Sequence, residues 1–130
     1  MLSAYNNRGN ARYAVGDLDG AIADYTRGIQ LSPRQGTDKE PSNVLLGLNY
    51  NGRGNALAAQ GKLDLAIADY STAIEIAPRF ADAYANRGLA LLRRGRTSEA
   101  EQDFEQSLRL DPSLKASLED RINRVIAPKR

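Results

Sequence analysis

A single pattern of small, aromatic and proline residues occurs three times along this chain of 130 residues. The first, or leading, glycine of the pattern is Gly9 in the first copy, Gly54 in the second and Gly88 in the third. A second glycine follows each leading glycine by seven residues. An alanine follows the first glycine by twelve residues, an aromatic residue by sixteen and a proline by twenty-four. This recurrence indicates a repeat protein, in which one small structural unit is stacked several times.

Each copy is predicted to form a helical hairpin. Small and apolar residues spaced three and four apart lie on one face of each of two helices, and the second glycine separates the helices. A glycine inside a helix costs about 1 kcal/mol relative to alanine, so the leading glycines imply close approach of neighbouring helices. The predicted repeats span about residues 2–35, 47–80 and 81–114.

These residues resemble the tetratricopeptide repeat family, whose unit of about 34 residues has an aromatic residue, a glycine, an alanine, a second aromatic residue and a closing proline. The resemblance covers about residues 2–112. It implies an all-α fold, a right-handed superhelical stack of helical hairpins (an α-solenoid) with about seven helices. It also implies a single non-catalytic domain that mediates protein–protein interaction.

One departure from the family is an arginine just before each leading glycine, where leucine is usual. A subset of bacterial repeats is similar in having Asn-Arg-Gly at this place. An aspartate follows each arginine by sixteen residues, so the two are predicted to form an ion pair within a hairpin or between adjacent ones. The alternative is an anion site built from the arginines. The predicted pairs are Arg8 with Asp24, Arg53 with Asp69, and Arg87 with Asp103.

An insertion of about eleven residues, roughly 36–46, separates the first and second copies, because their leading glycines are 45 residues apart instead of 34. It begins as a polar segment and becomes apolar at Val44 and Leu45. A helix that starts at Pro41 or Ser42 and continues into the second repeat would make these apolar residues a contact surface. An ordinary surface loop is the alternative.

A C-terminal capping helix is predicted over about 113–126, after the third copy. Leu118 and Ile122 belong to its apolar stripe, which would cover the last hairpin. Arg121 and Arg124 belong to its other face, which is predicted to be solvated.

Composition excludes several functional classes. The chain has no cysteine and no histidine, which removes disulfides, thiol chemistry and almost all zinc or haem sites, so no cofactor or metal is expected. Without these residues no catalytic constellation is recognisable, and the chain is predicted not to be an enzyme. The net charge is only +2, which is a poor basis for binding nucleic acid, so no nucleic-acid partner is expected. The absence of a long apolar segment predicts no membrane partner and a cytoplasmic location.

The resemblance implies a binding surface on the concave side, lined by the first helix of each repeat. Amide side chains could satisfy the backbone of an extended peptide, two leucines could receive an apolar anchor, and an arginine would favour an acidic flank. Alternatively, the amides are only solvated and the C-terminal helix covers the leucines. The predicted groove residues are Asn6, Asn10, Tyr13, Asn51, Asn55, Asn86, Leu89, Leu92 and Arg93.

The predicted partner is a protein or peptide. A clamp for the acidic tails of heat-shock chaperones is not expected, because only Asn10 matches its five positions and Asp82 has the wrong charge sign there. The alternative function is self-assembly into a homo-oligomer, through a first hairpin that no capping element precedes and through the inserted segment.

Overall fold

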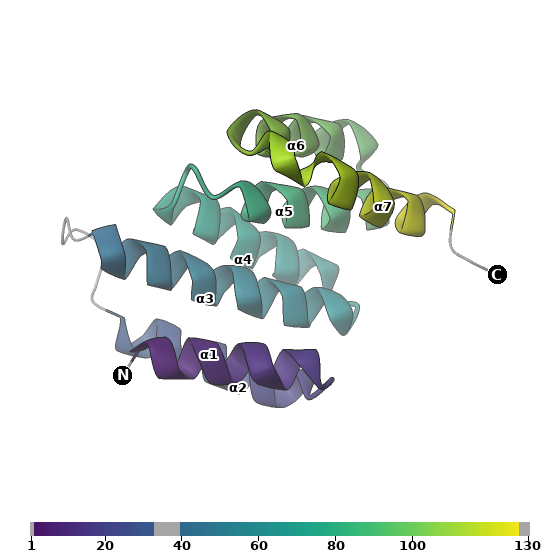
Figure 1. Ribbon diagram of the computed structural model, residues 1–130. Helices are drawn as coiled ribbons and strands as arrows, with labels where there is room; N and C mark the ends of the chain where they lie inside the picture. The colour runs from purple at the N-terminus through teal and green to yellow at the C-terminus, as the bar shows by residue number, and fades with distance from the viewer. Residues whose placement is uncertain (1, 33–39, 128–130) are drawn as a thin grey trace.

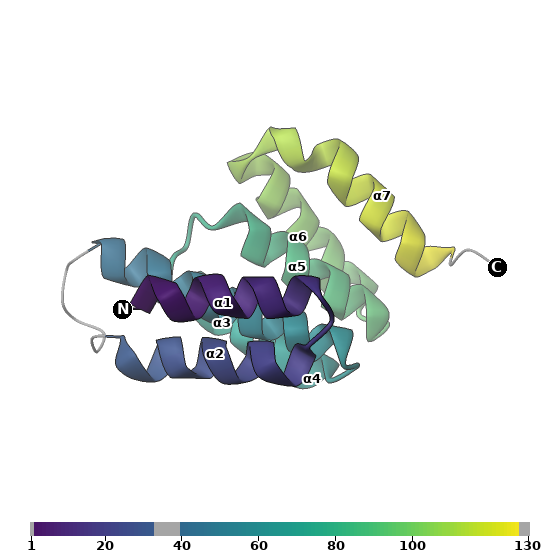
Figure 2. The same ribbon diagram turned by 60° about the horizontal axis from the view of Figure 1, so that its bottom comes forward.

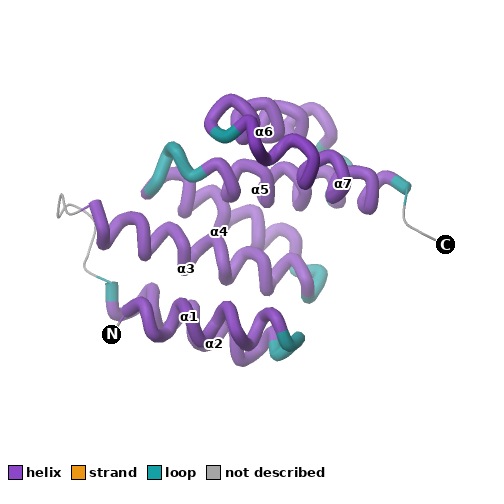
Figure 3. The backbone as a smooth tube through the Cα atoms, viewed as in Figure 1, coloured by secondary structure: helices purple, strands orange, loops and turns teal. Residues whose placement is uncertain are grey.

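The computed structural model describes residues 2–32 and 40–127, which form seven α-helices and one 3₁₀ turn without any strand (Figures 1 and 3). The all-α fold predicted from the sequence is therefore confirmed. The helices are α1 (Leu2–Ala14), α2 (Leu18–Leu31), α3 (Glu40–Ala59), α4 (Leu63–Ile76), α5 (Ala81–Arg93), α6 (Thr97–Leu110) and α7 (Lys115–Ile126), and the 3₁₀ turn is η1 (Pro112–Leu114).

The helices pair into three hairpins that stack on one another. α1 packs with α2, α3 with α4, and α5 with α6. The first helices also contact one another in the order α1, α3, α5, and α7 follows them against α5 (Figures 1 and 2). This arrangement produces two layers, one of first helices and one of second helices.

A glycine with positive φ makes the turn within each hairpin: Gly16 at 86°, Gly61 at 81° and Gly95 at 80°. This left-handed conformation is strained for residues with a side chain, which explains why glycine recurs there. Asp17 then caps α2, because its carboxylate accepts a hydrogen bond from the Gly20 amide at 3.0 Å.

The leading glycines allow an aromatic ring of the second helix to lie directly against the first helix. A Cβ atom on Gly9 would lie 2.8 Å from the ring of Tyr25, and one on Gly54 would lie 2.7 Å from the ring of Tyr70. The predicted close approach is thus confirmed. The helices meet where a side chain would not fit.

The apolar core lies between hairpins as well as within them. Ala21 and Tyr25 of α2 pack against Ala56 of α3, and a second cluster joins α4 to Ala90 of α5 in the same way. A third cluster joins α5 to Leu118 of α7. Each hairpin therefore depends on its neighbour to bury its apolar surface, as expected for stacked repeats.

Arginine–aspartate pairs recur within all three hairpins, as the sequence predicts. Arg53 donates to Asp69 through Nε at 2.8 Å and through Nη2 at 2.9 Å, and it stacks over the Tyr50 ring. This hydrogen bonding raises the pKa of Arg53 above its ordinary value. Its Nη1 reaches the preceding hairpin, at Thr26 Oγ1, 3.3 Å away. Carboxylates of the fold, rather than a bound anion, therefore engage these arginines.

Helix α3 is 20 residues long and starts at Glu40, seven residues before the predicted start of the second repeat at about residue 47. The structure thus supports the predicted helical extension from Pro41 or Ser42. The predicted polar segment before Glu40 lies outside the described residues. Val44 in the extension is 54% exposed, whereas Leu45 is half-buried.

None of the described helices combines the length and the apolar character required to cross a bilayer.

Candidate functional site

A hollow of about 270 Å³ opens on the side of the first helices, between α1, α3, α5 and α7. α7 lies at the end of the stack away from α1 (Figure 2), and its residues Arg121, Arg124 and Val125 form one side of the lining. The structure brings five of the nine predicted groove residues together in the lining. They are Tyr13, Asn55, Asn86, Leu89 and Arg93.

Buried tyrosines of the second helices orient two of the amides. The Tyr70 hydroxyl donates to Asn55 Oδ1 at 2.6 Å, and the Tyr25 hydroxyl donates to Asn10 Oδ1. Because the oxygen of Asn55 is occupied, its side chain can offer the Nδ2 donors to the hollow. Asn10 is exposed on α1 but does not line the hollow.

Three other predicted amides form bridges between first helices. Asn6 of α1 donates to Asn49 of α3 at 3.0 Å, and Asn86 of α5 donates to Asn51 of α3, also at 3.0 Å. All four side chains are buried. The structure therefore places Asn6 and Asn51 between helices rather than along the hollow, and Asn86 at its inner wall. Asn49 was missed by the sequence analysis.

The two predicted leucines differ in their surroundings. Leu89 packs against Leu118 of α7 and is only 9% exposed. Leu92 is half-buried and does not line the hollow. The C-terminal helix α7 thus covers Leu89, in agreement with the alternative interpretation of the sequence. The remaining apolar surface for a ligand is small.

Three arginines gather where α5 meets α7, and no acidic residue lines the hollow within the part of the chain described. Arg93 donates to the Ala58 carbonyl at 3.0 Å, and Arg121 donates to Asn86 Oδ1. Arg124 forms an exposed ion pair with Asp120. This end of the hollow can therefore attract a negatively charged group.

Arg121 and Arg124 were predicted to be solvated, and the sequence analysis did not assign them to the groove. A signal was present in the repeat period, since Arg121 follows Arg87 by 34 residues. By this spacing α7 has the sequence position of a first helix, although Ile122 stands where the repeats have their leading glycine.

A second hollow, of about 430 Å³, lies where the start of α3 meets the corner between α4 and α5. Val44, Leu48 and Phe80 line it, and none of the predicted groove residues does. The helical extension of α3 creates one wall of this hollow.

The buried tyrosines predict a loss of stability at alkaline pH. Burial raises the pKa of Tyr25 from 10.0 to about 12, and it raises the pKa of Tyr70 as well. A raised pKa in the folded state leaves stability unchanged below about pH 10 and lowers it as the pH rises toward 12. Urea unfolding between pH 8 and 12 measures this loss.

The matched variant is the double substitution Tyr25→Phe and Tyr70→Phe. It removes both titrating groups and should give a flatter pH profile above pH 10 than the parent protein. Equal slopes for the two proteins would show that other groups cause the alkaline loss.

Family models place this chain in a known class. The "Tetratricopeptide repeat" model matches residues 3–35 and 81–114, and the "TPR repeat" model matches residues 54–95. The chain belongs to the tetratricopeptide repeat family, a class of protein-interaction scaffolds. A comparison with curated proteins finds no match.

Solved structures agree with this assignment. The second domain of Spaghetti (RPAP3), bound to the HSP90 peptide SRMEEVD, is 33% identical, with a TM-score of 0.70 and coverage of 85% of this chain and 87% of that one. The second domain of human RPAP3, in complex with the HSP70 peptide SGPTIEEVD, is 28% identical, with a TM-score of 0.73 and coverage of 97% and 93%.

The TPR2B domain of yeast Sti1, in a complex with pHsp70, has a TM-score of 0.80 at 21% identity, and the match covers 98% of each chain. At this identity the likeness concerns the fold alone. The stack of helical hairpins predicted from the sequence is confirmed as a tetratricopeptide solenoid.

Proposed function

We propose that this protein is a non-catalytic scaffold that binds an extended, acidic peptide or protein segment in the hollow between α1, α3, α5 and α7. The observation that carries the proposal is the charge of this hollow, which is lined by three arginines and no acidic residue among the described residues. Two related domains at 28% and 33% identity are solved with acidic peptides.

Each polar group of the hollow has a distinct task in this proposal. Asn55 donates to a backbone carbonyl of the ligand, because Tyr70 already occupies its oxygen. Arg93 and Arg124 receive the carboxylates. Both arginines are exposed, and the present partner of Arg124 is an exposed aspartate, so exchanging it for a ligand costs little. Tyr13, 39% exposed, offers an aromatic surface opposite them.

The acidic ligand does not have to be a chaperone tail. The clamp positions of that subfamily hold a glycine at residue 52 and an acidic side chain at Asp82 in this chain, whereas the cations of the hollow come from the end of α5 and from α7. The proposal therefore specifies the charge of the ligand, whereas its amino-acid sequence is to be determined by peptide selection. The bacterial type of repeat and the cytoplasmic location expected from the sequence stay predictions.

Selection from a library of random decapeptides displayed on phage tests the proposal. Peptides that bind the parent protein are expected to be enriched in aspartate and glutamate. In fluorescence anisotropy, the double variant Arg93→Ala and Arg124→Ala should bind the best of them about tenfold more weakly, because charged hydrogen bonds are lost.

The control variant removes the same charge elsewhere. Arg27→Ala with Arg109→Ala changes two exposed arginines that do not line the hollow, on α2 and α6, and should leave the affinity unchanged. Selected peptides without acidic residues, or equal weakening by both double variants, would contradict the proposed site.

A further inference from the structure

The second hollow lies on the same side of α3 as the first hollow, the one between α1, α3, α5 and α7. Val44 and Leu48 line the second hollow, whereas Asn55 lines the first. Leu48 follows Val44 by four residues and precedes Asn55 by seven, a spacing that places all three along one side of a helix. A ligand that lies along α3 can therefore reach both hollows.

The second hollow offers the apolar surface that the first one lacks. Val44 is 54% exposed and Leu48 is 38% exposed, and Ile76 and Phe80 complete the apolar lining. The volume of about 430 Å³ falls within the range of pockets that bind ligands, roughly 300–1,000 Å³. In the first hollow, by contrast, α7 covers Leu89, which was predicted to receive an apolar anchor. An apolar side chain of a ligand is therefore accommodated better in the second hollow.

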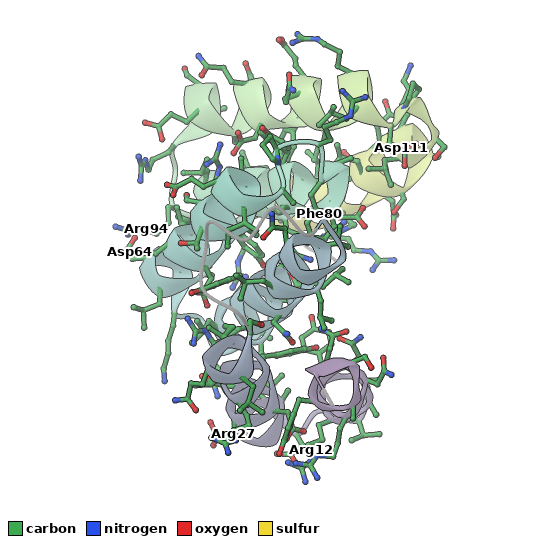
Figure 4. All side chains as sticks on the ribbon, turned by 90° about the vertical axis from the view of Figure 1, so that its left-hand side faces the viewer. Arg12, Arg27, Asp64, Phe80, Arg94 and Asp111 are labelled. Atoms are coloured by element: carbon green, nitrogen blue, oxygen red, sulfur yellow. The ribbon has the colours of Figure 1, made fainter. Side chains whose placement is uncertain are left out.

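The insertion between the first two repeats contributes to this hollow. Val44 belongs to the seven residues by which α3 precedes the second repeat, and Phe80 lies at the corner between α4 and α5. Figure 4 looks at the end of the molecule where α3 begins and labels Phe80 beside the first turns of that helix. A repeat of regular length would lack the wall that Val44 provides.

Charge determines which part of a ligand enters which hollow. Three arginines and no acidic residue line the first hollow within the described part of the chain. At the second hollow, the exposed Arg79 is followed three residues later by the exposed Asp82, whose opposite charge offsets it. Asp82 also precedes Asn86 by one helical turn, so it lies on the side of α5 that faces the path between the hollows. Acidic residues are therefore favoured in the first hollow and disfavoured on the way to the second.

The distance between the hollows sets the spacing within the ligand. Leu48 and Asn55 are seven residues apart on one helix, which corresponds to about 10 Å at 1.5 Å per residue. Between them, Asn51 is bonded to Asn86 of α5, and both side chains are buried. An extended peptide that crosses this bridge advances by about 3.3 Å per residue. It therefore covers the distance in about three residues.

We propose that the second hollow is the anchor subsite for an apolar side chain of the same ligand, three or four residues away from its acidic residues. The inference rests on the proposed function, because it adds a contact to the acidic segment that binds in the first hollow. It narrows the ligand class to segments that combine acidic residues with a leucine, methionine or phenylalanine at this spacing. Burial of that side chain against Leu48 and Phe80 supplies affinity, whereas the arginines select for charge.

Fluorescence anisotropy with a designed series of labelled peptides tests the anchor subsite. Each peptide contains two adjacent glutamates and one leucine, separated by zero to six glycine and serine residues, in both chain directions. The parent protein is expected to bind most tightly when two or three residues separate them. At that spacing it should bind about tenfold more tightly than it binds the same peptide with serine in place of leucine, because the leucine side chain is buried.

The variant with Val44→Gln and Leu48→Gln should lose this tenfold difference and still bind the serine peptide as the parent protein does. Glutamine is a good helix former and both positions are exposed, so the fold is retained. The matched control is Val15→Gln with Leu65→Gln, which changes an exposed valine and an exposed leucine that line neither hollow. This control should keep the tenfold difference.

The outcomes distinguish this inference from the proposed function. Equal affinity for the leucine and serine peptides at every spacing, or equal losses in the two double variants, would overturn the anchor subsite alone. Replacing the two glutamates of the peptide with glutamine should weaken binding as well. If it does not, the proposed function fails and this inference fails with it.

Discussion

Replacing Gly52 with alanine is expected to destabilise the protein by about 2 kcal/mol, although alanine is the better helix former. A Cβ atom on Gly52 would lie 2.6 Å from Cζ of Tyr25. Little room is left for the ring to shift, because the same ring atoms also lie close to Gly9 of α1, the side chain is only 2% exposed, and its hydroxyl bonds Asn10. Since Gly52 belongs to α3 and Tyr25 to α2, the overlap would push neighbouring hairpins apart.

Thermal unfolding followed by circular dichroism measures this effect, and a fall in Tm of roughly 6–10 °C is expected. Gly47→Ala in the same helix is the matched control, because its Cβ atom would first meet Ala77 at 3.4 Å, an ordinary contact. That variant should keep or raise the Tm. Equal Tm values for the two variants would show that the ring of Tyr25 has room to adjust.

Replacing Asp69 with alanine is expected to cost about 2–3 kcal/mol, because it leaves the guanidinium group of Arg53 without its main partner. The Asp69 side chain is 10% exposed and that of Arg53 is 24% exposed, so water replaces the lost carboxylate only in part. Removing one partner of a buried pair costs more than the pair contributes, since a charge then stays buried without compensation. The contact between Arg53 and Thr26 would also lose its alignment.

Urea unfolding of the variant gives this free energy directly. Asp64→Ala is its control, because Asp64 also pairs with an arginine, Arg94, at 2.9 Å, but at side-chain exposures of 73% and 48%. Exposed pairs contribute little, so this variant should change stability by less than about 0.5 kcal/mol. Similar losses from the two variants would mean that burial does not decide the strength of these pairs.

The fold could be predicted from the sequence because its strongest constraints are local and repeated. The glycine with positive φ, the glycine beneath an aromatic ring and the arginine sixteen residues before an aspartate each specify a contact within one hairpin. Three copies of each made these signals easy to recognise.

The hollow was less predictable, because it depends on how hairpins are rotated against one another. Asn51 and Asn55 are one helical turn apart, yet Asn51 is buried against α5 while Asn55 lines the hollow. Counting from the leading glycine places both on one stripe and cannot tell which of them the next helix covers. The contribution of Arg121 and Arg124 depends on the direction of α7, which departs from the repeat.

In the proposed complex, the bridge from Arg121 to Asn86 to Asn51 competes with the ligand for Arg121. These contacts link α7 to α5 and α5 to α3, so three walls of the hollow are joined by one chain of polar groups. A carboxylate that draws Arg121 toward itself takes a donor away from Asn86, whose amide is buried. In the proposed complex, a ligand carboxylate bound by Arg121 would therefore loosen the contact between α7 and α5.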